Sequence, residues 1–134
     1  MKTKLFKTTL FLLLLVAALN EFGTIFYLYW TTKWFDMITH FLGGATAGLG
    51  VILFFVYILK KQNVSRRQII WIGIVGTFVI GILWEVYELS FGITSFSDGM
   101  YYVLDTSKDI TMDMLGGILG SLYAAKQQIQ IDHE

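Results

Sequence analysis

The sequence contains no cysteine, no proline and few charged residues. Without cysteine there is no disulfide, no thiolate nucleophile and no thiolate metal site. Without proline the helices lack proline kinks. Only 15% of the 134 residues are charged, 55% are hydrophobic, and the mean hydropathy is +0.62. This composition is too apolar for a water-soluble domain, so the chain is predicted to be an integral membrane protein whose partner is the lipid bilayer, with no nucleic-acid partner.

The apolar residues form four segments, at about residues 5–30, 35–59, 68–91 and 106–125. A helix needs about 20 residues to cross the hydrocarbon core, so the chain has room for four crossings with short loops and no separate soluble domain. The predicted fold class is all-α: a polytopic membrane protein in which residues 1–134 form one antiparallel bundle of four transmembrane helices. The 13 glycines favour close helix contacts, and glycine-rich helix faces also suit a homo-oligomer.

The first segment also matches a signal peptide, because lysines precede an apolar run that ends near Ala17 and Ala18. However, apolar and aromatic residues continue to Trp30, which is a full spanning length. The spanning interpretation is therefore preferred.

Charge is distributed unequally between the two sides of the predicted bundle. Eight of the ten basic residues fall on one side: Lys2, Lys4, Lys7, Lys60, Lys61, Arg66, Arg67 and Lys126. By the positive-inside rule that side is cytoplasmic, which predicts an inner-membrane protein with both termini in the cytoplasm. Eight of the ten acidic residues lie toward the outer half: Glu21, Asp36, Glu85, Glu88, Asp98, Asp105, Asp109 and Asp113.

The outer acids recur at helical spacing, so each predicted helix directs carboxylates to one face. Asp36 and His40 are four residues apart, Glu85 and Glu88 are three apart, and the first helix adds Glu21. The fourth helix places acids at successive turns: Asp105, Asp109 and Asp113. At a rise of about 1.5 Å per residue, His40, Glu85 and Asp109 come out at about the same depth, so they can meet.

Carboxylates in a membrane must pair, become protonated or bind a cation. Only Lys33 and Lys108 are outer bases, so a divalent ion is the direct way to balance these charges. The predicted ligands are His40, Glu85, Glu88, Asp109 and Asp113, with Glu21, Asp36 and Asp105 as additional candidates. Carboxylates suit Mg²⁺, Mn²⁺ or Ca²⁺, and the histidine widens the choice to Zn²⁺ or iron.

Simpler interpretations exist for several of these acids. Asp105 and Asp109 can cap the fourth helix, and Asp36 can be a first-turn acid favoured by the helix dipole. Capping does not explain Glu85, Glu88 or Asp113. For those three the alternative is a protonated, hydrogen-bonded network that holds the helices together.

Three sequence blocks resemble a known family. They are Phe35 to Gly44 (FDMITHFLGG), Leu83 to Glu88 (LWEVYE) and Leu104 to Gly117 (LDTSKDITMDMLGG). In this order they resemble YjdF-type small membrane proteins, which are related in pattern to the VanZ-like group. VanZ-like proteins are associated with glycopeptide resistance, so the resemblance implies a role at the cell envelope and a shared site, but no particular reaction.

Three functions remain open from the sequence. The first is a metal-binding membrane protein that acts as an enzyme on a lipid or lipid-linked envelope substrate near the outer leaflet. The second is a proton- or cation-coupled transporter, since protonatable acids in a bundle can relay protons. The third is a structural or partner-binding protein with a protonated polar network.

Overall fold

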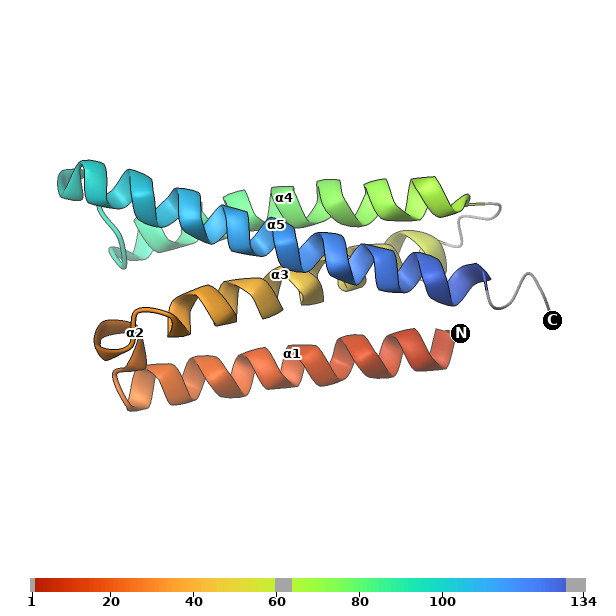
Figure 1. Ribbon diagram of the computed structural model, residues 1–134, viewed down its shortest axis with the longest axis horizontal. Coiled ribbons are helices and arrows are strands. Elements are labelled where there is room, and N and C mark those ends of the chain that lie inside the picture. The colour runs from red at the N-terminus through yellow and green to blue at the C-terminus, as the bar shows by residue number, and fades with distance from the viewer. Residues whose placement is uncertain (1, 60–63, 130–134) are drawn as a thin grey trace.

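The computed structural model describes residues 2–59 and 64–129, and these residues form helices and loops with no strand. Four long helices lie side by side in alternating directions (Figure 1). They are α1 (Lys2–Ile25), α3 (Phe35–Leu53), α4 (Arg66–Phe91) and α5 (Met100–Ile129). Shorter elements are α2 (Leu28–Thr31), the π-helix η1 (Phe54–Ile58) that continues α3, and the 3₁₀ helix η2 (Phe96–Asp98). The predicted all-α class is confirmed.

Among the described residues, three segments are long and apolar enough to cross a membrane: Lys4–Ile25, Phe35–Val56 and Arg66–Phe91. The fourth long helix, α5, has 30 residues but carries Asp105, Lys108, Asp109 and Asp113 along its first half. A fourth crossing therefore stays a prediction. The start of α1 and the end of α5 lie at the same end of the bundle (Figure 1).

Two predicted helix limits are wrong. The first helix ends at Ile25, because Tyr27 has a left-handed backbone with φ of 56° and the short α2 follows it. The last helix begins at Met100, directly after Gly99 with its φ of 59°, and not near residue 106. Apolar residues 100–104 extend this helix toward its start. Asp105 is consequently inside α5, and the interpretation of Asp105 as an N-terminal cap is wrong.

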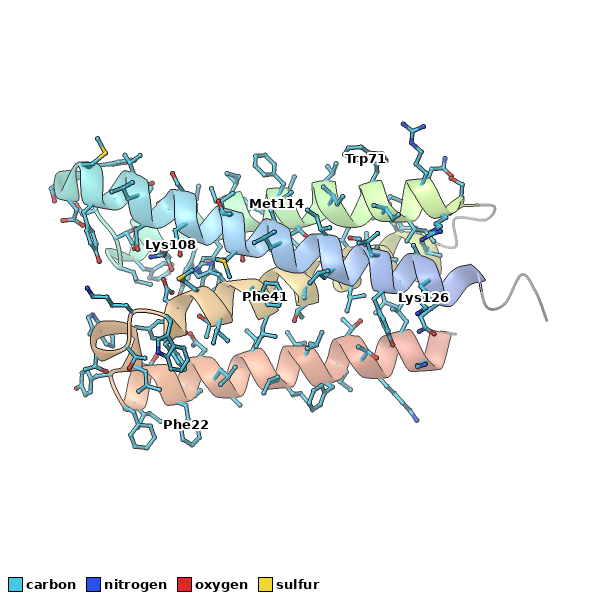
Figure 2. All side chains as sticks on the ribbon, viewed as in Figure 1. Phe22, Phe41, Trp71, Lys108, Met114 and Lys126 are labelled. Carbon is cyan, nitrogen blue, oxygen red and sulfur yellow. The ribbon has the colours of Figure 1, made fainter. Side chains whose placement is uncertain are left out.

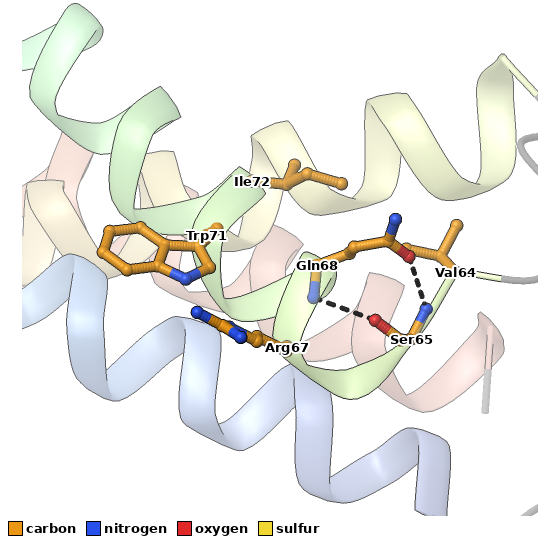
Figure 3. Close-up of a pocket in the computed structure, with 6 residues that line it drawn as sticks. All are labelled: Val64, Ser65, Arg67, Gln68, Trp71 and Ile72. Atoms are coloured by element: carbon orange, nitrogen blue, oxygen red, sulfur yellow. Dashed lines mark hydrogen bonds between the residues drawn. The ribbon is translucent and has the colours of Figure 1, made fainter.

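Helix α4 begins at Arg66, close to the start of the predicted apolar segment at about residue 68. Ser65 accepts a hydrogen bond from the backbone N–H of Gln68 at 3.3 Å, and its own N–H donates to Gln68 Oε1 at 2.8 Å (Figure 3). This reciprocal capping box fixes where the helix begins. Residues 60–63, which include Lys60 and Lys61 of the predicted cytoplasmic side, lie outside the described residues.

Helix α5 packs against both α3 and α4, and its backbone approaches that of α3 very closely. A Cβ atom on Gly44 would collide with the carbonyl of Asp113, and one on Gly116 would collide with the carbonyl of Phe41. These backbones can approach so closely only because glycine occupies both positions. Gly43, one residue earlier, faces open space because adjacent helical residues point in different directions.

The buried interior differs between the two ends of the bundle. At the end that holds the start of α4, the core is apolar: Leu5, Leu49, Ile52, Val64, Ile69, Ala124 and Ala125. At the other end, titratable side chains are buried. Large apolar side chains are exposed on every long helix, as expected for a surface that faces lipid.

Candidate metal centre

Helix α3 contributes a histidine and an aspartate to the polar end of the bundle. His40 is 8% exposed, and its Nε2 atom lies 3.6 Å from Oδ1 of Asp36, one helical turn earlier. The side chain of Asp36 is 25% exposed. The four-residue spacing brings the two groups to one face of the helix, as the sequence predicts.

Helix α5 places two buried aspartates against this pair. Asp113 Oδ1 lies 3.4 Å from Nδ1 of His40, so both ring nitrogens face carboxylates. Asp109 is 2% exposed, and its Oδ1 atom has no hydrogen-bond partner within residues 2–59 and 64–129. A buried polar atom without a partner is costly, so it points to a group that completes the site.

Within residues 2–59 and 64–129, one group of side chains could hold a metal ion. Single ligand atoms of Asp36, His40 and Asp109 all lie within 4.8 Å of one another. We call these three residues the triad. Two carboxylates and an imidazole are ligands that divalent cations accept. His40 and Asp109 are among the ligands predicted from the sequence, while Asp36 is an additional candidate that the structure brings into the centre.

The other predicted carboxylates come from α4. Glu85 is 5% exposed, and its Oε2 atom accepts a 2.7 Å hydrogen bond from the hydroxyl of Thr106 on α5. Its Oε1 atom has no hydrogen-bond partner in the described part of the chain. Glu88 is half-buried and accepts a 2.9 Å hydrogen bond from the indole N–H of Trp84. Both glutamates lie within electrostatic range of His40.

The remaining predicted residues lie at the rim or outside. Asp105 forms a 2.6 Å ion pair with Lys108, whose side chain is 37% exposed. Lys108 projects from α5 toward α3 (Figure 2), and its charge also acts on Asp36 and Asp109. Glu21 is exposed on α1, apart from the buried carboxylates.

The helices also pack closely between the triad and the apolar core of the bundle. Thr77, 1% exposed, donates to the carbonyl of Gly73 at 2.9 Å and is 3.4 Å from that of Gly44. A Cβ atom on Gly117 would collide with the Thr77 side chain. Three helices therefore meet here with no room for larger side chains.

An open groove lies where α4 begins, at the end of the bundle that holds the apolar core. It is lined by Val64, Ser65, Arg67, Gln68, Trp71 and Ile72 (Figure 3). The triad is accordingly a buried cluster between helices and not the floor of this groove.

Sequence reasoning misses two neutral partners of the glutamates. The predicted start of the last helix places Thr106 in its first turn, so no contact of Thr106 with α4 is expected. Trp84 lies four residues before Glu88, a spacing that brings both side chains to one face and that could have revealed the contact.

A family model described as "Predicted membrane protein (DUF2238)" matches residues 1–129. No curated protein and no solved structure matches the chain.

Proposed function

Because the chain belongs to the DUF2238 family of predicted membrane proteins, whose description names no reaction, we propose a function from the site itself. The proposed function is to hold a divalent cation at Asp36, His40 and Asp109 in the outer half of the bundle. The supporting observation is that these three ligand atoms lie within 4.8 Å of one another, with Asp109 Oδ1 buried and unpaired in the described residues.

The charge of the site favours a cation over a neutral ligand. Asp36 and Asp109 converge on a histidine, and the nearby lysine, Lys108, is already paired with Asp105. A carboxylate taken out of water without compensation costs several kcal/mol. A divalent ion would neutralise both aspartates at once and give Asp109 Oδ1 the partner that it lacks.

The donor atoms narrow the choice of ion. Two carboxylate oxygens and one imidazole nitrogen suit first-row ions such as Mn²⁺, Fe²⁺ and Zn²⁺ better than Ca²⁺ or Mg²⁺, which prefer oxygen alone. Three protein ligands also leave coordination positions for a substrate. An ion bound there would supply Lewis-acid chemistry.

We further propose that the centre serves an enzyme that acts on a lipid or lipid-linked envelope substrate near the outer leaflet. The partly exposed Asp36 forms the accessible edge of the triad, and the helices around it expose apolar side chains suited to lipid. The three sequence blocks resemble YjdF-type proteins, which are related in pattern to the envelope-associated VanZ-like group, and this resemblance supports the envelope location but no particular reaction. The inner-membrane location with both termini cytoplasmic belongs to this proposal.

Transport by a single chain is a weaker alternative. A translocated ion needs polar groups on the inner side of the triad, yet Thr77 and the glycines of α3 and α5 close that region. The core beyond them is apolar.

Metal analysis of the purified full chain in detergent tests the proposal. After loading with Mn²⁺ or Zn²⁺ and removal of free ion, the wild type should retain metal at a fixed ratio to protein. Asp109→Asn and His40→Gln should lose the triad's ion. The matched control is Asp98→Asn, because Asp98 is an exposed acid in η2. A wild type that is folded by circular dichroism yet retains no metal after loading would overturn the proposal.

A further inference from the structure

We propose that Glu85 and Glu88 form a second cation position beside the triad, so that the polar end of the bundle is a two-cation centre. This inference rests on the proposed function, because it adds an ion to the same site. The inference is based on a buried glutamate on α4 that has one unpaired carboxylate oxygen and interacts electrostatically with His40 of α3 and with Asp105 and Asp113 of α5.

Glu85 is buried with one of its carboxylate oxygens unpaired in the described residues. Its side chain is buried, and only one of its two carboxylate oxygens has a donor, the Thr106 hydroxyl. The other oxygen, Oε1, has no hydrogen-bond partner among residues 2–59 and 64–129. Leaving a buried acceptor unpaired costs about 1–3 kcal/mol, and more when it is charged. The triad's ion does not remove this cost, because Glu85 is not part of the triad.

A single ion leaves several carboxylates of this centre uncompensated. Among the described residues, six carboxylates interact electrostatically here: Asp36, Glu85, Glu88, Asp105, Asp109 and Asp113. Lys108 compensates one of them through its ion pair with Asp105, and a divalent ion at the triad compensates two more. Three negative charges remain in a low-dielectric region, and a second divalent ion at the glutamates reduces them to one.

The two glutamates lie near each other and near the residues around the triad. Glu85 and Glu88 are one helical turn apart on α4 and act on each other electrostatically. Asp113 connects them to the triad, because its Oδ1 faces His40 and its Oδ2 lies 3.0 Å from the place where a Cβ on Gly81 would stand. Gly81 is one turn before Glu85, so the carboxylate of Asp113 reaches from α5 to both α3 and α4.

The donor atoms of the second position are all oxygen. Glutamate carboxylates favour hard ions such as Mn²⁺ and Mg²⁺, whereas the histidine of the triad favours a first-row ion. Mn²⁺ satisfies both positions, which makes it the suitable probe. In two-metal sites the ions lie about 3.5–4 Å apart, close enough for their electron spins to couple.

The test loads the purified full chain with Mn²⁺ alone and measures bound metal per protein together with the electron paramagnetic resonance spectrum. Wild type should bind two Mn²⁺ and show the signal of a coupled pair. Glu85→Gln should bind one and show an isolated ion. Glu21→Gln, the same change on the exposed face of α1, should still bind two.

The outcomes separate this inference from the proposed function. One Mn²⁺ in both wild type and Glu85→Gln would overturn the second position and leave the triad standing. Two Mn²⁺ in both would also overturn it, because the second ion would then lie elsewhere. A folded wild type without Mn²⁺ would overturn both proposals. Circular dichroism of Glu85→Gln verifies that the loss of an ion is not a loss of folding.

Discussion

His40 of α3 and Asp113 of α5 are joined through Nδ1 and Oδ1 at 3.4 Å, which leaves Nε2 facing Asp36. A neutral imidazole has one N–H and one free electron pair. If Nδ1 carries the proton toward Asp113, Nε2 is free to bind an ion. We therefore expect Asp113, a predicted ligand, to orient the histidine rather than to bind the triad's ion itself.

The first prediction concerns this positioning role. Asp113→Asn should weaken metal affinity at the triad by about 10- to 100-fold, the usual loss when the residue that orients a metal-binding histidine is changed. Competition with a chelator of known affinity measures the change in the purified protein. Asp98→Asn is the matched control and should leave affinity unaltered. Equal affinity in Asp113→Asn and wild type would contradict the positioning role.

The second prediction concerns the hydroxyl that supports Glu85. Thr106→Val keeps the side-chain shape but removes the donor to Glu85 Oε2, so metal-free protein should lose about 1–3 kcal/mol of unfolding free energy. Unfolding in mixed micelles with increasing denaturing detergent measures the difference. Thr111→Val is the control, because Thr111 is exposed on the same helix and donates only to the carbonyl of Ser107. Equal losses of unfolding free energy in both variants would show that the hydrogen bond from Thr106 to Glu85 does not stabilise the protein more than the Thr111 hydroxyl does.

The third prediction uses the absence of cysteine, which makes single-cysteine labelling simple. If α5 crosses the membrane and both termini are cytoplasmic, Ser97→Cys should react with an impermeant maleimide on intact cells. Lys126→Cys should react only after the cells are opened. The native residues Ser97 and Lys126 are exposed on either side of the predicted fourth crossing. Labelling of both positions from the same side would show that α5 does not cross.

Helical spacing predicts contacts within one helix but not all contacts between helices. Asp36 and His40 share a face because they are four residues apart, and the sequence alone is enough to show this. The pairing of Thr106 with Glu85 depends on how α4 and α5 are rotated and shifted against each other. The error at the start of α5 hides that pairing as well, because it places Thr106 in the first turn of the helix.

The distinction between Gly43 and Gly44 is likewise beyond the sequence, since the two glycines are adjacent and chemically identical. Only the packing of α5 decides which one has a neighbour. Gly44 faces the backbone of Asp113, whereas Gly43 has open space beside it.

The fourth prediction follows from that difference. Gly44→Ala should destabilise the protein by about 1–3 kcal/mol, because its methyl group collides with the Asp113 carbonyl and must push α5 away from α3. The same displacement should separate Asp109 from His40 and weaken metal binding. Gly43→Ala should be neutral or gain about 0.5–1 kcal/mol from the higher helix propensity of alanine. Unfolding free energy and metal retention measured on both variants provide the comparison. If Gly44→Ala matched Gly43→Ala in both measurements, α3 and α5 would not be in the close contact that forms the triad.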